Sequence, residues 1–495
     1  MANKNTLPFN EIVGGRFGRK IAYTDVDEIN ESNVVKVVGD CCGVFTMNKR
    51  AIEYLYNYYK GDQPVLYRTK TMRDDIINKV VENHAFEIVQ FKCAQSYGEP
   101  IQIVALKNDD DINKAVDKFN AYTRAANKSA RDIEIGIWQS ATGTAYKGVQ
   151  FTGKKDLPFR YVCLSPLNTF VIYSSKTNEP LAGVQELKDA EGRNYKLVFT
   201  ASHEYRIQDS KLLGLDVDEK GTVMYSRLHG FGDIPIVEYP NNADRLSDIE
   251  LVISLLDAIN NMQSNRMDAV EQFVQSWIKF INCEIDEDTF KQMKMQGALV
   301  VKSNGDNKKV DVEVMTQELS QTESQVAKKD LWDNALSISG IPNTEQGSDG
   351  GSTQGAVELR SGWDFSKQRA RLKDPFIIES ERRIDAITIN AIRVKGNNDV
   401  PLTMFDYDVQ INHSPTDNML VKTQALSNLL NAGIHPLVAI RTIGLFEDSE
   451  KTFMLSKEYL DKMLYEVEDR EEQEARARQI LANEKKVNDG SNNEK

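Results

Sequence analysis

One continuous helical pattern constrains this chain more than any other feature. Ser247 and Glu250 form the Ser-x-x-Glu capping box that opens helices, and the pattern then runs to Ile281, roughly 50 Å at 1.5 Å per residue. Apolar residues recur along one narrow stripe, namely Ile249, Val252, Leu256, Ile259, Val270, Phe273, Trp277 and Phe280. A helix far longer than the usual ~12 residues needs neighbouring helices along its length. An ordinary core helix with a kink near 263–266 is the alternative.

A second helix is predicted to run back beside the first. It spans about 318–339, with Ala327, Leu331, Ala335 and Ile338 on one face, and Gly340 and Pro342 end it. The intervening segment, 282–316, reads as a compact insertion with a short helix and two strands, the second carrying Val310, Val312 and Val314. The two long helices therefore form a hairpin with a small tip.

The segment after this hairpin begins with a Gly/Ser-rich loop over 343–355. A third long helix is predicted over about 356–395, bent where Gly362 and Pro375 fall. A lone strand follows, with Phe405, Tyr407, Val409 and Ile411 predicted inward and Asp406 and Asp408 on a solvated face. Helices fill 417–480, and residues 482–495 have the composition of a disordered tail.

The N-terminal half combines helices with a β region, so the fold class is α+β. Residues 1–35 read as a mobile arm, and helices are predicted at 46–59, 72–83 and 109–130. Three acids at 109–111 open the last of these; they suit helix capping better than a metal cluster. Short strands separated by turn residues predict an antiparallel β region over 144–240.

Composition excludes several classes of protein. The 495 residues include no apolar stretch of ~18, so no membrane span is expected. The net charge of −13 argues against a conventional nucleic-acid binder. It is compatible with a channel through which DNA slides, because such a channel needs no strong binding sites for DNA. Five cysteines with irregular spacing fit neither a disulfide framework nor a metal knuckle, and we expect them reduced. The five histidines show no zinc spacing, so no metal or other cofactor is expected.

One segment imitates a phosphate-binding loop. Gly148 to Lys154 has the G-x-x-x-x-G-K spacing, but Lys155 replaces the Ser or Thr that ligates magnesium and Pro158 interrupts the following helix. The flanks alternate as in a β-hairpin, so a turn at Gly153 and Lys154 is the better interpretation. With no other catalytic motif in view, we expect no enzyme activity.

The order of these elements resembles the portal proteins of tailed bacteriophages, in particular the branch from long-tailed phages of Gram-positive bacteria. The resemblance is carried by IPIVEYPNNADRLSDIELVISLLDAINNMQSNRMDAVEQF (234–273), LWDNALSISGIPN (331–343), GSTQGAVELRSGWDFSKQRARLKDPF (351–376) and NLLNAGIHPLVAIRTIGLFEDSEK (428–451). It covers about 240–480, whereas 1–140 match only in general character. A non-portal scaffold or tail adaptor with a coiled-coil stalk is the alternative.

The resemblance implies a portal fold, with a mixed α/β wing, a two-helix stem, a small α/β clip, a long kinked wing helix and an α-helical crown. The implied boundaries are an arm (1–35), wing (36–240), stem helix 1 (241–281), clip (282–316), stem helix 2 (317–342), tunnel loop (343–355), kinked wing helix (356–396), returning wing strand (397–416), crown helices (417–480) and a disordered tail (481–495). The subunits would form a ring, with twelve copies expected.

The resemblance also implies the function and the partners. The ring would sit at the capsid vertex of the virion, after assembly in the host cytoplasm, as the head–tail connector. Double-stranded DNA would pass through its channel during packaging by the terminase large subunit and again during ejection. Major capsid and scaffolding proteins and head-completion or adaptor proteins would be further partners. The loop over 343–355 lacks a bulky apolar residue, so it does not by itself predict a steric gate.

Candidate site residues follow from this architecture. In the tunnel loop, the DNA-contacting candidates are Asn343, Gln346, Ser348, Ser352, Thr353 and Gln354. On stem helix 2, the channel-facing candidates are Thr322, Lys329 and Asp333, opposite Leu331 and Ala335. Gln263 and Arg266 interrupt the apolar stripe, and Arg266 is predicted to pair with an acid of a neighbouring subunit and fix the register, with solvent exposure at a kink as the alternative. In the clip, the partner-binding candidates are Lys302, Asn304, Asp306, Lys308 and Lys309.

Overall fold

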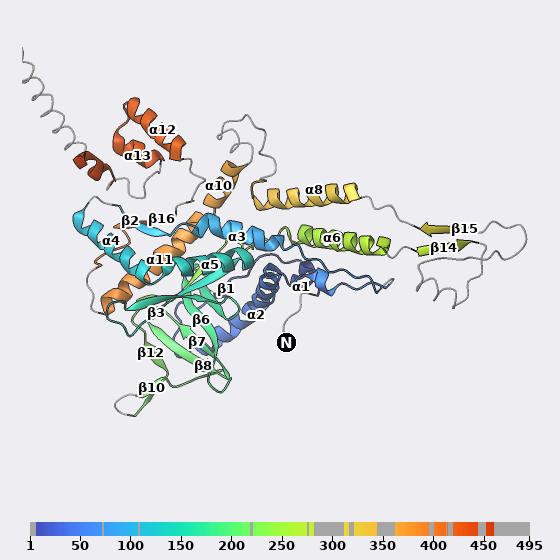
Figure 1. The fold of residues 1–495 in the computed structure, drawn as a ribbon. Helices are drawn as coiled ribbons and strands as arrows, with labels where there is room; N and C mark the ends of the chain where they lie inside the picture. The colour runs from blue at the N-terminus through green and yellow to red at the C-terminus, as the bar shows by residue number, and fades with distance from the viewer. Residues whose placement is uncertain are drawn as a thin grey trace, which may run out of the picture. The chain divides into compact units, whose positions relative to one another are not determined.

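The chain divides into two compact units, residues 1–413 and 414–495 (Figure 1). The computed structural model describes residues 6–71, 74–106, 109–217, 221–274, 277–281, 311–315, 321–343, 362–395, 400–411, 413, 419–443 and 452–459. None of the described helices has the length and apolar character that crossing a membrane requires.

Helices form the first part of unit 1. They are α1 (Phe9–Val13), α2 (Val34–Tyr59), a 3-10 turn (Pro64–Tyr67), α3 (His84–Tyr97), α4 (Asp110–Ala125) and α5 (Lys128–Thr142). The Asp109 side chain accepts the backbone N–H of Asp111, so the capping role predicted for this acidic run is confirmed. The single helix predicted over 109–130 is two helices, because Asn127 between them has a φ of 53°. Helix α2 begins well before the predicted 46.

Two predictions for this region are wrong. The described part of the arm is ordered: Phe9 is 1% exposed against α2, and strand β1 (Ala22–Thr24) pairs with a strand of the main sheet. Residues 76–83 are extended instead of helical. The reason is that side chains of the helix over 253–274 accept hydrogen bonds from the backbone N–H groups of this segment. These N–H groups therefore need no helical hydrogen bonds.

The β region confirms the antiparallel prediction for 144–240. Its strands are β3 (Thr144–Phe151), β4 (Phe159–Leu164), β5 (Thr169–Ser174), β6 (Pro180–Lys188), β7 (Asn194–Phe199), β8 (His203–Gln208), β9 (Lys211–Leu212), β10 (Asp216–Val217), β11 (Val223–Met224), β12 (Ser226–Leu228) and β13 (Ile236–Pro240). A seven-stranded sheet has the order β1-β5-β6-β7-β8-β12, with β9 beside β8, and a second sheet has the order β13-β3-β4. The one parallel pair among them is β1 with β5, which the arm contributes.

The segment that imitates a phosphate loop is a β-hairpin. Strands β3 and β4 pair antiparallel up to Phe151 opposite Phe159, and the backbone N–H of Thr152 reaches Pro158 O at 2.9 Å. Gly153 and Lys154 lie in the connecting turn, as predicted, and no helix follows.

The long helical pattern is shorter in the structure than predicted. Helix α6 spans Ile253–Val274, after turns over 248–252, and residues Trp277–Ile281 are not its last turns but strand β14, paired with β15 (Asp311–Met315). The stretch WIKFI (277–281) is compatible with both the helical and the strand period of apolar residues, and its pairing with β15 makes it a strand. Strand β15 matches the second strand predicted for the insertion. The other elements predicted over 282–310 lie outside the described residues.

The remaining elements of unit 1 follow the predicted order. Helix α8 spans Gln321–Ser339, and Gly340, with a φ of +68°, ends it as predicted. The third helix is broken into α10 (Trp363–Arg371) and α11 (Asp374–Val394), with Pro375 in the first turn of α11. Strand β16 (Tyr407–Gln410) is not alone, because it pairs with β2 (Gln102–Ala105). Phe405, predicted inward, is 79% exposed, since it lies in the turn before β16.

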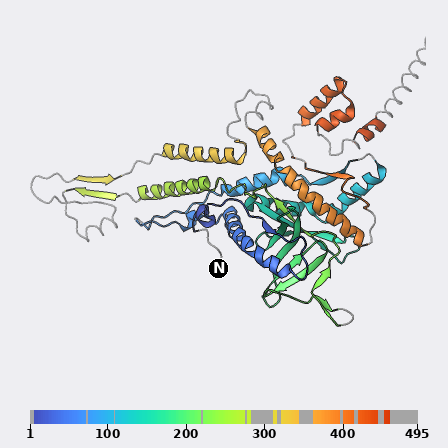
Figure 2. The ribbon, with the colours of Figure 1, turned by 180° about the vertical axis from the view of Figure 1, so that it is seen from behind.

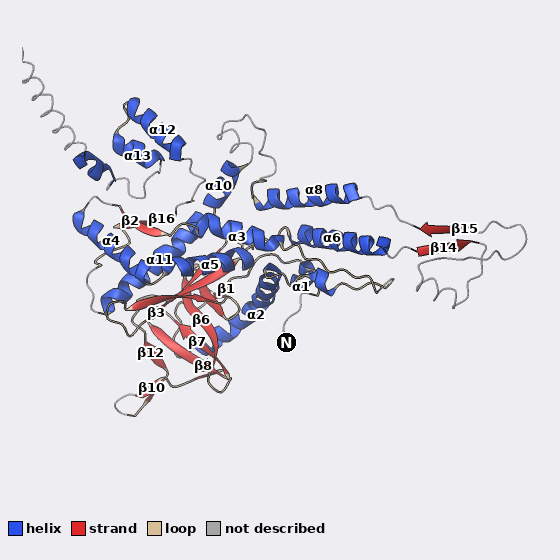
Figure 3. Cartoon of the chain, viewed as in Figure 1, coloured by secondary structure: helices blue, strands red, loops and turns tan. Residues whose placement is uncertain are grey.

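Two hydrophobic cores position the candidate site. One lies between α5, α11 and the β13-β3-β4 sheet, and the other packs α2 and α3 against the start of α6 and against Ala335 of α8 (Figure 3). Unit 2 contains α12 (Met419–Asn431), α13 (Pro436–Ile443) and a helical segment over 452–459. Helices were predicted there, and Ala439 and Ile440 are buried.

Candidate functional site: the α6–α8 helix pair and its anchors

Helices α6 and α8 lie side by side (Figures 1 and 2). Arg266 of α6 donates a hydrogen bond to Gln325 of α8 at 3.0 Å. Two further contacts hold α8 to the start of α3 and the residues just before it: Lys328 pairs with Glu82 at 2.6 Å, and the Trp332 ring stacks on His84 with 3.9 Å between ring centroids. The hairpin of two long helices predicted from the sequence is therefore present over the described residues.

The extended segment 78–82 lies along one face of α6 and binds its polar side chains. The backbone N–H groups of Asn78, Val80 and Glu82 donate to Asp268 (2.6 Å), Ser264 (2.9 Å) and Asn260 (2.8 Å). The match is geometric, because four helical residues rise about 6.0 Å and two extended residues about 6.6 Å. Arg68 and Lys70 also pair with Asp268. This ladder covers one face of α6 with the same chain, so that face is closed to any partner.

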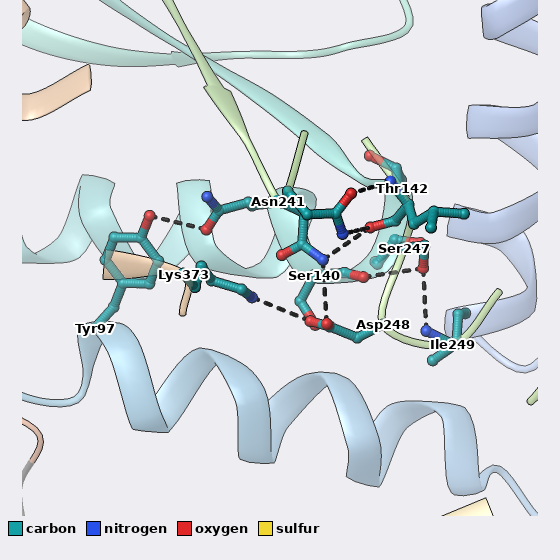
Figure 4. Close-up of polar contacts among 12 residues, drawn as sticks. Tyr97, Ser140, Thr142, Asn241, Ser247, Asp248, Ile249 and Lys373 are labelled. Atoms are coloured by element: carbon teal, nitrogen blue, oxygen red, sulfur yellow. Dashed lines mark hydrogen bonds and ion pairs between the residues drawn. The ribbon is translucent and has the colours of Figure 1, made fainter. Parts of the chain in front are cut away.

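The hydrogen bonds of the predicted Ser247–Glu250 capping box are present, but they begin the turns over 248–252, and α6 itself begins only at Ile253. Ser247 N–H donates to Glu250 Oε2 (3.1 Å), and Ile249 N–H donates to Ser247 Oγ (3.2 Å). Ser247 Oγ in turn bonds the carbonyl oxygens of Ser140 (3.0 Å) and Ala141 (2.9 Å) at the end of α5 (Figure 4). Ser247 therefore fixes the segment directly before α6 to the end of α5.

Two buried ion pairs surround this cap. Arg19, from the N-terminal segment, reaches Glu250 at 2.5 Å, with side chains 1% and 0% exposed. Arg245 binds Glu238 with two hydrogen bonds, at 2.7 and 3.0 Å. Burial by itself would raise the pKa of Glu238, but Arg245 outweighs it and holds that pKa below its ordinary value. Arg19 and Glu250 join segments 231 residues apart, whereas Arg245 and Glu238 are seven residues apart, both in the stretch from β13 to α6.

The joint between α10 and α11, here called the elbow (residues 363–376), contacts three other helical elements. Ser366 accepts a hydrogen bond from Gln95 of α3 at 2.7 Å. Arg369 donates to the last carbonyls of α8, Ser337 O (3.3 Å) and Ile338 O (2.7 Å), and so caps that helix. Lys373 pairs with Asp248 at 3.2 Å, directly before α6 (Figure 4). The elbow thus holds one end of each helix in the pair.

The structure places the described site candidates as follows. The three channel-facing candidates share one face of α8. Lys329 lies about seven and Asp333 about eleven residues after Thr322, so at 100° per residue their side chains leave the helix within an arc of about 40°. Thr322 and Lys329 are exposed, whereas Ala335 on the opposite face is 0% exposed. Asp333 accepts a hydrogen bond from Asn343 at 2.8 Å, so these two candidates, predicted in separate groups, contact each other.

Of the two register candidates, Arg266 has a partner within the chain. Gln325 of the same chain contacts Arg266, where an acid of a neighbouring subunit was predicted. Gln263 is half-buried, and its Oε1 finds no hydrogen-bond partner among the described residues. The other tunnel-loop candidates and all the clip candidates lie outside the described residues. Sequence reasoning missed Arg369 and the ladder on α6, although the i, i+4 spacing of Asn260, Ser264 and Asp268 was a readable signal.

A buried cluster of charges lies under this region, between α5, β3 and α11. Lys147 pairs with Asp132 and Glu381, each at 2.6 Å, and Lys128 pairs with the same two acids at 2.7 and 2.9 Å. Burial would raise the pKa of Glu381, but the two lysines hold it at about 2. Burial and the nearby Glu381 raise the pKa of Asp385 to about 8. The cluster therefore contains two lysines, two carboxylates and one acid that stays protonated at neutral pH.

Metal sites and cysteines can be checked over the described residues. No cluster of three or more His, Cys, Asp or Glu side chains among them could hold a metal ion. The four described cysteines, Cys41, Cys42, Cys93 and Cys163, are free thiols, as predicted.

A family model described as "Phage portal protein, SPP1 Gp6-like" matches residues 41–484. The chain therefore belongs to this family of phage portal proteins, and its role is that of a portal, or head–tail connector. The match favours the portal interpretation over the scaffold or tail-adaptor alternative. The Gram-positive branch stays a prediction, because the family description names no host.

Comparisons with other proteins add likenesses in structure. No curated protein matches the chain significantly. Chains in two solved structures, the neck of an empty gene transfer agent (GTA) particle computed with C6 symmetry and that of the native particle with C12 symmetry, have TM-scores of 0.43 and 0.44. Both are 11% identical and cover 73% of this chain and 90% and 89% of theirs. A chain in the virion of the native particle has a TM-score of 0.41 and 11% identity, covering 82% of this chain and 93% of its own. The family assignment rests on the sequence match alone.

Proposed function

We propose that copies of this chain, twelve by expectation, close into a ring at the capsid vertex of a virion. Double-stranded DNA would pass through the axial channel during packaging and ejection. The observation that carries this proposal is the family match over residues 41–484. The α6–α8 pair supports it, because a pair of helices anchored at one end to a large folded region suits a channel wall.

The channel face of this wall is proposed to be the exposed side of α8. The ladder covers one face of α6, and the hydrophobic core takes the face of α8 that carries Ala335. On the remaining side, Thr322 and Lys329 are exposed and Asp333 is half-buried, so this side carries one positive and one negative charge. Contacts of DNA phosphates with such a surface are weak and independent of sequence, which suits transport of a whole genome.

The remaining partners follow from the same role. We propose that Asn343 and the loop residues Gln346, Ser348, Ser352, Thr353 and Gln354 contact the passing DNA. Terminase and head-completion proteins would dock on the clip, including Lys302, Asn304, Asp306, Lys308 and Lys309. Capsid and scaffolding proteins would surround the ring, which would assemble in the host cytoplasm. In this role the chain is structural, and the terminase supplies the energy for packaging.

The test exchanges one charge on the proposed channel face. Lys329→Glu should leave ring assembly intact and reduce the amount of DNA packaged, because it makes the wall more negative toward phosphate. Lys114→Glu on α4 is the matched control, since Lys114 is also strongly exposed, at 77% of its side chain. Equal packaging by Lys329→Glu, the control and the unchanged protein would contradict the placement of this face in the channel.

A further inference from the structure

His413 is held by hydrogen bonds at the end of unit 1. Its Nδ1 lies 2.8 Å from the backbone oxygen of Gln95 on α3, and its Nε2 lies 2.8 Å from Asp374 Oδ2 at the start of α11. The side chain is 14% exposed. It is the last described residue before unit 2 begins at residue 414.

Both partners of this imidazole are hydrogen-bond acceptors. A neutral imidazole carries one N–H group, so it can donate to only one of them, whereas the protonated ring donates to both. The geometry therefore fits the charged form. Asp374 depends on this contact, because its other oxygen, Oδ1, is buried without a hydrogen-bond partner among the described residues. A largely buried carboxylate that loses a cationic partner is destabilised.

The charged groups around His413 act in opposite directions. From α11, the hydrogen bond to the Asp374 carboxylate raises the pKa of His413, and burial opposes it. The Gln95 carbonyl on α3 supports the charged form, and Arg371 on α10 disfavours it. The net result is a pKa above the ordinary value. The contact is complete below about pH 6.5, and it is lost as the pH rises through the raised pKa.

We propose that His413 is a charge-dependent latch that fixes the point where the chain leaves unit 1. In its protonated form it fastens this exit point to α3 and to the elbow; in its neutral form it releases one of the two contacts. Because Asp374 directly follows Lys373, which holds the start of α6 through Asp248, the latch ties the exit point to the same elbow that holds the α6–α8 pair. This device goes beyond the proposed channel function and does not depend on it.

The test measures the titration of His413 in the full-length protein. Exchange of the histidine C2 hydrogen, followed by mass spectrometry across pH 5–10, reports the pKa of each histidine. His413 should titrate above 6.5 and His229 below it, because burial lowers the pKa of His229. His413 titrating with or below His229 would overturn the proposal.

A second measurement connects the charge to the exit point. Amide hydrogen exchange of residues 407–411, corrected for the intrinsic effect of pH, should be slower at pH 6 than at pH 9 in the unchanged protein, because both contacts of His413 are made only when its ring is charged. His413→Gln, which stays neutral, should exchange at pH 6 as the unchanged protein does at pH 9. Exchange that is the same at both pH values in the unchanged protein contradicts the latch, even if the variant fails to fold.

Discussion

Replacement of Asp385 by asparagine should stabilise the protein at neutral pH. Asp385 is 2% exposed, beside the carboxylate of Glu381 and the lysines of the buried cluster. Its pKa rises from 3.8 to about 8, first because burial removes water and then because Glu381 is negative. The folded state therefore keeps a proton that the unfolded chain releases above pH 4, so the stability contributed by this group falls as the pH rises from 4 to 8.

The size of the effect follows from linkage. In the unfolded chain, pH 7 lies about three units above the pKa of this carboxyl. At 1.36 kcal/mol per unit, the loss of stability caused by the retained proton is therefore at most about 4 kcal/mol. Asparagine is neutral in both states and removes this penalty. Its amide must still find partners in a buried site, which offsets about 1–3 kcal/mol. We expect a net gain of up to about 1–3 kcal/mol at pH 7 and a net loss of about 1–3 kcal/mol at pH 4, where the proton no longer carries a penalty and only the cost of burying the amide remains.

The assay is denaturant unfolding of the full-length protein at pH 4, 7 and 8.5. The matched control is Asp132→Asn in the same cluster. Asp132 contacts both lysines, so its neutralisation leaves buried positive charge and should cost about 3–5 kcal/mol at pH 7. If Asp385→Asn destabilises the protein at pH 7 as much as the control does, the assignment of the proton to Asp385 is wrong.

Three further predictions test the anchors of the helix pair by the same unfolding assay, with ring assembly as a second measurement for Arg266. Glu250→Gln should cost about 3–5 kcal/mol, because it leaves the buried Arg19 without a counter-charge, while Ser247→Ala should cost only about 1 kcal/mol as a lost cap. Gly340→Ala should cost about 1–3 kcal/mol, and more than Gly192→Ala, since both have positive φ but only at Gly340 would a Cβ meet Arg369, at 2.5 Å from its Cδ. Arg266→Ala should change stability by no more than about 0.5 kcal/mol and leave the ring intact, given its contact with Gln325; loss of the ring would instead favour pairing with a neighbouring subunit.

Much of the fold was readable because its signals are local. The capping box at Ser247, the stop at Gly340, the bend at Pro375 and the antiparallel region over 144–240 all depend on residues close in sequence, and the structure confirms each of them. The same holds for the turn at Gly153 and Lys154. These features follow from backbone preferences that act within a few residues.

The errors arose where distant partners decide local structure. Residues 76–83 have a sequence compatible with a helix, but Asn260, Ser264 and Asp268 satisfy their backbone in an extended form. The stretch 277–281 continues a helical period, yet pairing with 311–315 makes it a strand. The N-terminal segment looked unanchored because its partner for Arg19, Glu250, is 231 residues away. The buried charge cluster joins three such distant elements and gives no short sequence signal.

The most direct test of the central claim is an image of the purified full-length protein. Electron microscopy in moderate salt, with particles seen end-on, should show closed rings with a central hole, and native mass measurement should give a multiple of 56.0 kDa, with twelve copies expected. Particles that stay monomeric at micromolar concentration, or that assemble without a central hole, would contradict the assignment of a portal ring to this chain.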